Sequence, residues 1–167
     1  MDDLHLTVML TRHSDAHRQT HITTFVNVNK FAAQLYRTPH SIFTDSRSFR
    51  IWALWLMRGA LEYPGNDREE VEPLKNYLPA AVAWVSIIGP EIFSWDNEFP
   101  TGHREGDPGR GGPLWNGQHG FCKERWKLWK QRFVELSSSD ELDKELREVA
   151  AEGAAKMDEA ETLAAEM

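Results

Sequence analysis

The sequence predicts an all-α fold, an irregular bundle of about six helices with a long Gly/Pro-rich loop before the penultimate helix. Apolar residues recur at the three- and four-residue spacing of helices through most of the chain. Glycine and proline gather in one stretch, and an acidic, alanine-rich segment with helical spacing closes the chain. The chain has 167 residues, of which 41% are hydrophobic, so we expect one domain with an ample core.

The N-terminal region divides into an arm and the start of the domain. Residues 1–22 are polar and His-rich without a sustained period, so we expect a poorly ordered arm there, followed by a single helical domain over residues 23–167. From Asn27, a suitable N-cap, apolar side chains follow a helical spacing. Thr38 precedes a proline, which predicts the end of this first helix.

Two further helices are predicted in the middle of the chain. One runs from about Asp45 to Tyr63 and is apolar on most of its circumference, which predicts a central place in the core. The next has Pro79 in its first turn and a kink at Gly89 and Pro90, because proline has no N–H to donate. The Val and Ile residues of this second segment also fit a buried strand, although its alanines favour a helix.

Residues 96–117 predict a loop, because six glycines and three prolines fall within 22 residues. A loop of this length in a compact domain is either a functional lid or disordered. A helix from Phe121 to Leu136 follows, with aromatic side chains along one stripe. Residues 137–167 then predict an acidic C-terminal helix.

The net charge of −7 is unevenly distributed. From residue 137 onward ten acidic and three basic residues give 3 − 10 = −7, so residues 1–136 are electrically balanced. A nucleic-acid-binding protein is expected to carry a basic face, and we therefore expect no nucleic-acid partner.

Three features bear on the cellular compartment. The single cysteine, Cys122, excludes an internal disulfide and favours a reducing compartment. The N-terminus is acidic where a signal peptide would be basic. The longest nearly apolar run, Leu78–Gly89, has about 12 residues, against the roughly 20 needed to span a bilayer. We expect a cytoplasmic protein without a membrane segment, and a nuclear location stays open.

One stretch near the C-terminus resembles a known family. It reads GGPLWNGQHGFCKERWKLWKQRF over residues 111–133. It is similar to the C-terminal signature of a fungal family of uncharacterised proteins, domain-of-unknown-function family 3632, which reads in outline Gly-Gly-x-Leu-Trp-x-Gly, Gly-Phe-Ser, Glu-Arg-Trp and Trp-Lys-x-Arg-Phe. Weaker similarities lie at Val26–Ala33, Ile51–Leu54 with Arg58–Glu62, and Pro79–Trp84.

The resemblance covers about residues 25–160 and implies an all-helical, fungal-type protein with no assigned activity. Two departures accompany it. Residues 1–22 lie outside the resemblance, and an N-terminal helical part that is usual in the family is missing, which implies an incomplete core that relies on self-association. Cys122 stands where the family usually has Ser.

Polar groups near the loop are the candidates for chemistry. The weak catalytic candidates are His103, Asp107, His119 and Arg125. An arginine among apolar neighbours can clamp an anion, but the commoner arrangement for Arg58 is an i,i+4 ion pair with Glu62. We expect the core to be filled by five indoles, those of Trp52, Trp55, Trp84, Trp126 and Trp129. The side chains expected to line a pocket are Trp52, Trp55, Arg58, Trp84, Trp115, Trp126 and Trp129.

Two weaker patterns have common structural alternatives. His13, His17 and His21 are spaced by four and would share one face of a helix, where they could ligate zinc or copper. Because this segment lacks a helical pattern, a solvated arm is favoured and no metal site is expected. Cys122, beside Lys123 at a predicted helix start, has the setting of a low-pKa nucleophile. A buried structural cysteine is the favoured alternative.

The leading functional hypothesis is a small-molecule-binding helical protein that encloses an apolar ligand beneath the loop. The activity considered is a cofactor-free cyclase or isomerase of fungal-type secondary metabolism, acting by shape and electrostatic preorganisation. The alternatives are a protein-interaction module that docks through the acidic C-terminal helix, and a self-associating structural domain, such as a homodimer. An interaction module should keep its fold when residues from Ser137 onward are deleted.

Overall fold

The computed structural model describes residues 3–38, 46–64, 68–102 and 107–166. Within these residues it contains five helices and one two-stranded sheet, so the all-α prediction is confirmed and the number of helices is five rather than about six. The helices are α1 (Asp3–Arg37), α2 (Ser46–Leu61), α3 (Arg68–Ser94), α4 (Lys123–Ser137) and α5 (Lys144–Glu166), and the strands are β1 (Asn97–Glu98) and β2 (Gly120–Phe121).

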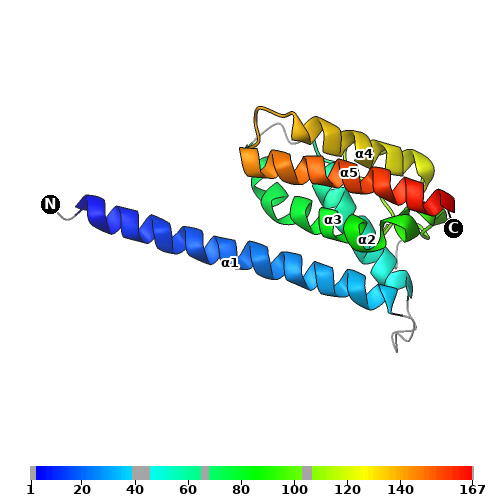
Figure 1. Cartoon of the computed structure of the whole chain (residues 1–167), viewed down its shortest axis with the longest axis horizontal. Helices are drawn as coiled ribbons and strands as arrows, with labels where there is room; N and C mark the ends of the chain where they lie inside the picture. Colours follow the sequence, from blue (N-terminus) through cyan, green and yellow to red (C-terminus); the bar gives the residue numbers. More distant parts are fainter. Residues whose placement is uncertain (1–2, 39–45, 65–67, 103–106, 167) are drawn as a thin grey trace.

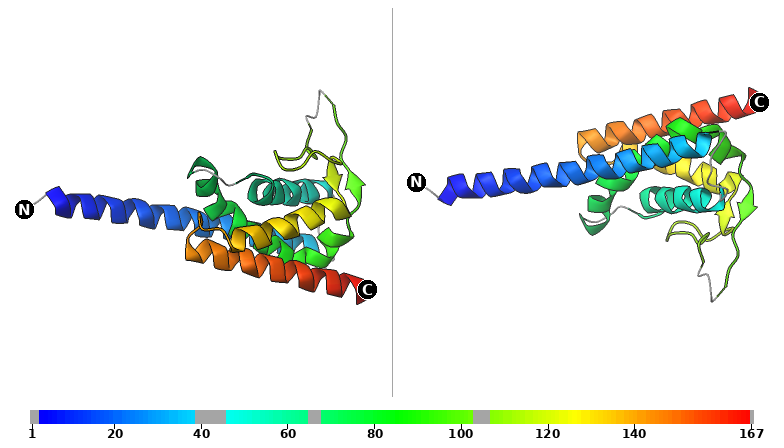
Figure 2. Two further views of the ribbon diagram at one scale, coloured as in Figure 1. Left: turned by 90° about the horizontal axis from the view of Figure 1, so that it is seen from above. Right: turned by 90° about the horizontal axis from the view of Figure 1, so that it is seen from below.

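The central helix of the bundle is α3, which packs against α1, α2 and α5. Figure 1 shows α4 and α5 side by side and antiparallel on one side of the bundle, and α1 crossing the other side. The two views in Figure 2 show that α1 extends well past the bundle at its N-terminal end. The prediction of a central helix over residues 45–63 is wrong, because α2 packs mainly on α3 and leaves Trp52 and Trp55 exposed to solvent.

The first helix begins much earlier than predicted, at Asp3 rather than near Asn27. The N-terminal part of this helix was not predicted because its sequence is only weakly amphipathic. No glycine or proline interrupts residues 3–37, so the sequence contains no helix breaker there. The helix ends at Arg37, just before the predicted stop. Its buried face carries Asn29, whose side chain accepts a hydrogen bond of 3.0 Å from Trp84 Nε1 and so joins α1 to α3.

The central helix α3 also begins earlier than predicted. Pro73 and Pro79 lie inside it, so the prediction that Pro79 occupies a first turn is wrong. Burial of Leu74 and Leu78 stabilises the helix through both prolines. The strand alternative for this segment is also wrong. The predicted kink is confirmed: Ile88, just before Gly89-Pro90, has non-helical dihedrals of φ −133° and ψ 31°.

The acidic helix α5 is an integral part of the core. It packs against α3 and α4, and its apolar stripe is buried: Leu146, Ala150, Met157 and Ala160. Gly153 faces the ring of Phe133, and this close approach leaves no room for a Cβ atom. Lys130 of α4 reaches Asp158 at 2.5 Å and Glu161 at 2.8 Å, and these carboxylates raise the pKa of the Lys130 ammonium.

The long loop is closed by the small sheet. β1 and β2 pair antiparallel, with Asn97 opposite Phe121, so the predicted loop over residues 96–117 leaves and re-enters the bundle at one point. Phe99 N donates to His119 O at 2.7 Å just inside this closure. Residues 107–119 of the loop are held by hydrogen bonds to side chains of α2 and α4.

The tryptophans divide between core and surface. The indoles of Trp84, Trp126 and Trp129 are buried, as predicted. Trp52 and Trp55 are 38% and 49% exposed, so the prediction that they fill the core is wrong. The ring centroid of Trp52 still lies 6.3 Å from that of Trp84 in α3, and Trp55 Nε1 donates to Pro108 O of the loop. The remaining core aromatic side chains include Trp95, Phe99, Phe121 and Phe133.

Candidate functional site

A buried ion pair joins the end of α2 to the start of α4. Glu62 and Arg125 are both 0% exposed. The guanidinium binds the carboxylate through two parallel hydrogen bonds, from Nε to Oε1 at 2.7 Å and from Nη2 to Oε2 at 3.0 Å. This bidentate geometry is the strongest form of an Arg–carboxylate interaction. The i,i+4 pair expected between Arg58 and Glu62 is not formed, because Glu62 turns toward Arg125.

Loop carbonyl groups and neighbouring N–H donors supply further hydrogen bonds to the charged groups of this pair. Arg125 Nη1 donates to Gly109 O at 2.9 Å and to Gly120 O at 2.8 Å. Glu62 accepts hydrogen bonds of 2.7 Å from Trp129 Nε1 and from Gly112 N. A buried charge is tolerated when it is paired and fully hydrogen-bonded, and this pair meets both conditions. Its groups are therefore occupied by structural bonds, which makes Arg125 a positioning residue rather than a free catalyst.

The same pair explains the glycine at residue 112. A Cβ atom there would lie 2.8 Å from Glu62 Cβ and from Glu62 O, so only glycine lets the loop backbone reach the carboxylate. Leu114 N donates to Glu62 O at 3.1 Å and adds a second backbone contact. The guanidinium also has a cation–π geometry with two indoles, since Arg125 Cζ lies 5.6 Å from the ring centroids of both Trp115 and Trp129.

Two side chains of α2 also donate hydrogen bonds to the loop backbone. Trp55 Nε1 donates to Pro108 O at 2.8 Å, and Arg58 Nη1 donates to Arg110 O at 3.0 Å. Hydrogen bonds to loop carbonyls fix a backbone that has little regular structure of its own. Residues 107–119 of the predicted lid are therefore hydrogen-bonded to side chains of both α2 and α4.

The fastened loop forms one wall of an open groove of about 690 Å³. Its basic side chains are Arg58, Arg110 and His119, and no aspartate or glutamate is among the described residues that line it. The buried Nδ1 atom of His119 has no hydrogen-bond partner in the part of the chain that the structure describes. The remaining lining residues are Tyr63, Gly111, Gly112, Pro113, Trp115, Asn116 and Gly117.

The structure therefore brings together only part of the predicted site. Arg58, Trp115 and His119 meet at the groove, and Arg125 lies within the structure that supports it. Asp107 is exposed and does not line the groove, and His103 lies outside the described residues. The buried indoles of Trp84, Trp126 and Trp129 face other side chains of the core: Asn29, Phe93 and Phe121.

Sequence reasoning missed three residues of this site. Glu62 was considered only as a partner of Arg58, although a carboxylate at the end of a strongly apolar helix signals a buried pair. Arg110 and Tyr63 carry no pattern of their own, because one lies in a loop and the other just past a helix end. Their place at the groove follows from the loop path, which the sequence does not specify.

Cys122 does not have the properties of an activated nucleophile. It precedes α4 with extended dihedrals, and its side chain makes no capping hydrogen bond. Burial raises the pKa of the thiol, and the Glu124 side chain raises it further, against the lowering effect of the Arg125 and Glu124 backbone amides. The structural alternative for this residue is therefore the better one.

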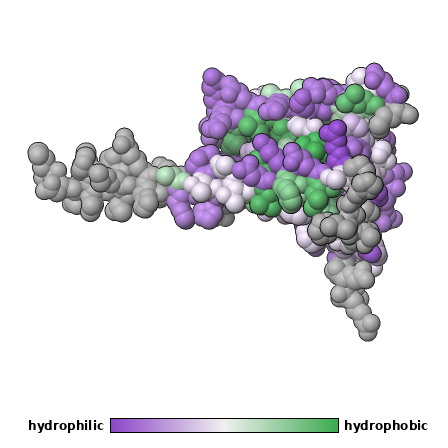
Figure 3. Space-filling view, turned by 60° about the horizontal axis from the view of Figure 1, so that its bottom comes forward, coloured by the Kyte–Doolittle hydropathy of each residue, from purple (hydrophilic) through white to green (hydrophobic). Residues whose placement is uncertain are grey.

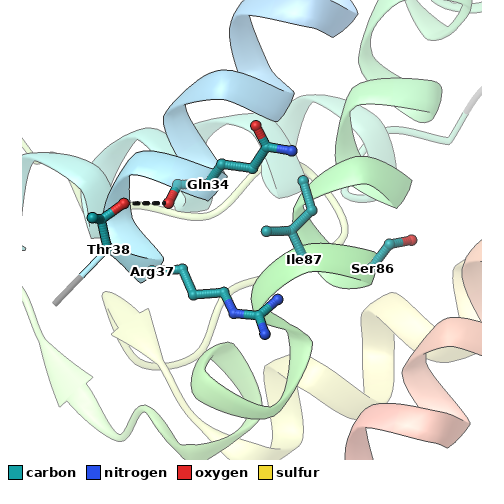
Figure 4. A pocket seen from close by; sticks show the side chains of 5 residues that line it. All are labelled: Gln34, Arg37, Thr38, Ser86 and Ile87. Carbon is teal, nitrogen blue, oxygen red and sulfur yellow. Dashed lines mark hydrogen bonds between the residues drawn. The ribbon is translucent and has the colours of Figure 1, made fainter.

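Another hollow on the surface has fewer charged and aromatic side chains than the groove. The hollow in Figure 4, about 370 Å³, lies between α1 and α3, and the described residues that line it include one charged side chain, Arg37, and no aromatic ring. Thr38 and Gln34 at its edge are engaged in a local bond, from Thr38 Oγ1 to Gln34 O. No group of three or more His, Cys, Asp or Glu residues suited to a metal ion occurs among the described residues.

The comparisons with known proteins identify a family but no function. The family model described as "Protein of unknown function (DUF3632)" matches residues 2–133, and the chain therefore belongs to this family. The match begins at residue 2, so the expectation that residues 1–22 lie outside the family pattern is wrong. No curated protein and no solved structure matches the chain.

One helix meets the length and composition of a membrane span. It is Pro73–Ser94 within α3, and 56% of its most apolar window is buried inside the protein. A core helix of a soluble protein passes the same test, so this is weak evidence for a membrane. The cytoplasmic location expected from the sequence stays a prediction.

Proposed function

We propose that this member of the DUF3632 family is a small-molecule-binding protein whose ligand carries an anionic group and lies in the groove beside Arg58 and Arg110. One observation carries the proposal. The groove combines two guanidinium groups, an imidazole and an indole, and its lining has no carboxylate in the part of the chain that the structure describes.

The charge of the groove is the first argument. The groove is built from the electrically balanced part of the chain, residues 1–136, so two arginines without an acid among the described lining residues give it a local positive charge. Arginine presents a planar fork of donors that fits carboxylate and phosphate oxygens. Arg125 adds no free positive charge, because Glu62 neutralises it.

The shape and rigidity of the groove are the second argument. Its volume of about 690 Å³ lies within the roughly 300–1,000 Å³ of ordinary ligand sites. Trp115 and Tyr63 offer flat apolar surface for a ring. The Trp115 indole is held by a hydrogen bond of 2.9 Å from Nε1 to Gln118 O, which lowers the entropic cost of ordering it around a ligand. These features favour an aromatic or other planar molecule with an acidic substituent over the wholly apolar ligand expected from the sequence.

The test uses 1-naphthoate as a planar anionic probe. Binding is followed by tryptophan fluorescence and by calorimetry for the wild type, Arg58→Gln and Arg110→Gln. Each substitution removes a charge-assisted hydrogen bond and is expected to weaken binding roughly tenfold or more. The matched control is Arg37→Gln, which removes the arginine from the hollow of Figure 4 and should leave the affinity unchanged.

The proposal is contradicted if both groove variants, Arg58→Gln and Arg110→Gln, bind the probe as the wild type does. Because Arg58 also holds the loop through Arg110 O, urea unfolding of each variant separates loss of binding from loss of structure. A neutral analogue, 1-naphthamide, tests the charge requirement and is expected to bind more weakly.

Catalysis is a further step of this proposal. The cofactor-free cyclase or isomerase considered from the sequence requires a group that exchanges protons at the ligand. In the groove this is His119, since an imidazole nitrogen can donate or accept a proton and the Nδ1 atom of this ring has no partner among the described residues. For a bound substrate, His119→Gln is expected to abolish turnover and to leave the binding affinity within a factor of about three.

A second candidate function is self-association through α1 and α2. Phe31 is 64% exposed and Val28 is 48% exposed on the outer face of α1. Trp52 of α2 lies beside Trp84, the residue that bonds to α1, so apolar side chains of both helices flank one junction. Figure 3 shows hydrophobic surface gathered in the middle of one face of the bundle.

The docking surface in this candidate is the exposed apolar face of α1 and α2 rather than α5, because the apolar stripe of α5 is already buried. The occupant considered is a second copy of the chain, because one exposed helical stripe can pair with itself around a two-fold axis. Native mass spectrometry of the wild type and of Phe31→Glu is the test. A dimer that Phe31→Glu dissociates supports this function, and a wild-type monomer contradicts it.

A further inference from the structure

Two histidines on α1 form a closely spaced pair. The Nε2 atoms of His17 and His21 lie 3.1 Å apart, and the two rings meet edge to face with centroids 4.6 Å apart. Both side chains are exposed. The expectation of a solvated arm without a metal site depended on this segment not being helical, and the structure places both residues inside a helix that runs from Asp3 to Arg37.

The distance between the two nitrogens fits a shared metal ion. Imidazole nitrogen binds Zn²⁺ and similar ions at about 2.0–2.1 Å. Two such bonds put the nitrogens about 2.9 Å apart at a right angle and about 3.3 Å apart at a tetrahedral angle. The observed 3.1 Å lies between these values, so both rings can reach one ion with small rotations of their side chains.

The helix sets the spacing between the two imidazole rings in the metal-free protein. Residues four apart lie one above the other on the same face of a helix. C-terminal to the pair, α1 is anchored to the bundle by partly buried Phe25, which meets the ring of Tyr77, and by Asn29, which accepts the bond from Trp84. The backbone under the two rings therefore needs no folding step to bind, which lowers the cost of chelation.

We propose that His17 and His21 chelate one divalent transition-metal ion through their Nε2 atoms, with water filling the remaining positions. The described residues supply no third ligand, so the site is open rather than a closed structural zinc site. The stability order of first-row ions predicts the tightest binding for Cu²⁺, followed by Ni²⁺ and then Zn²⁺. This site lies on α1, none of whose described residues lines the groove, and it does not depend on the proposed function.

The test is a titration of the full, tag-free chain with copper sulfate at neutral pH. Calorimetry gives the affinity and stoichiometry, and electron paramagnetic resonance reports the nitrogen donors. The wild type is expected to bind one Cu²⁺ with two imidazole nitrogens. His17→Ala and His21→Ala each convert a chelate into a single ligand and are expected to weaken binding roughly 100-fold.

His119→Ala is the matched control, because it removes a histidine of the bundle and should leave the copper affinity unchanged. Circular dichroism of each variant confirms that the helix content is retained. Copper binding of equal affinity and equal nitrogen count in the wild type and in the double variant His17→Ala/His21→Ala would overturn the proposal.

Discussion

At the scale of single residues, the Glu62–Arg125 pair organises the candidate site. It joins α2, α4 and the loop through hydrogen bonds to both helices and to loop carbonyls. The sequence pointed to Arg125 as a polar group near the loop, and the structure places its guanidinium in this pair. It did not identify Glu62 as the partner, since 62 residues separate the two side chains and only the fold brings them together.

Removal of the carboxylate should be costly. Glu62→Ala leaves the Arg125 guanidinium buried without a counter-charge, so we expect a loss of roughly 3–5 kcal/mol in the free energy of unfolding, measured in urea. The control is Glu148→Ala, which breaks an exposed ion pair with Lys144 and should change stability by less than about 0.5 kcal/mol. Equal effects of the two substitutions would show that the buried pair is not structural.

The thiol of Cys122 gives a second test at this scale. Because burial raises its pKa, a smaller fraction is thiolate at a given pH than in a free thiol. Alkylation by iodoacetamide at pH 8 should therefore be slower for the folded chain than for the chain in urea. The unfolded thiol ionises first as the pH rises, so this residue lowers stability at alkaline pH. Faster alkylation of the folded chain would restore the nucleophile hypothesis.

At the scale of helices and strands, the strongly patterned elements were the predictable ones. The helices now seen as α2, α4 and α5, the kink at Gly89-Pro90 and the glycine-rich loop follow from local sequence. The starts of α1 and α3 were missed for different reasons. α1 has little amphipathic pattern before Phe25, and α3 tolerates Pro73 and Pro79 because tertiary burial outweighs two lost backbone bonds.

The contact between α4 and α5 yields a prediction about one glycine. Helix propensity alone would make Gly153→Ala stabilising by about 1 kcal/mol. The ring of Phe133 occupies the space of the new methyl group, so we expect a net loss of roughly 1–3 kcal/mol in thermal or urea unfolding. In a Phe133→Leu background the same substitution should cost less, and an unchanged cost would place the strain elsewhere.

At the scale of the whole molecule, the chain is one bundle built around α3. The sequence indicated the fold class, the size of the core and the apolar stripe of α5, but not where that stripe packs. The path of the loop and the exposed position of Trp52 and Trp55 depend on contacts between distant segments, which spacing along the chain cannot specify.

Deletion of residues 137–167 tests the place of α5. The interaction-module hypothesis expected the remaining fold to survive. Because α5 covers α3 and α4, the shortened chain should instead lose cooperative unfolding and most near-ultraviolet circular dichroism. A shortened chain that unfolds cooperatively and keeps its aromatic signal would contradict an integral role for this helix.

The groove is tested most directly by nuclear magnetic resonance of the ¹⁵N-labelled chain during titration with 1-naphthoate. We predict progressive, saturable shifts of the amides of Gly111, Gly117 and His119, and smaller changes elsewhere. Shifts confined to the region of Phe31 and Trp52, or no saturable shift at all, would contradict binding at the groove.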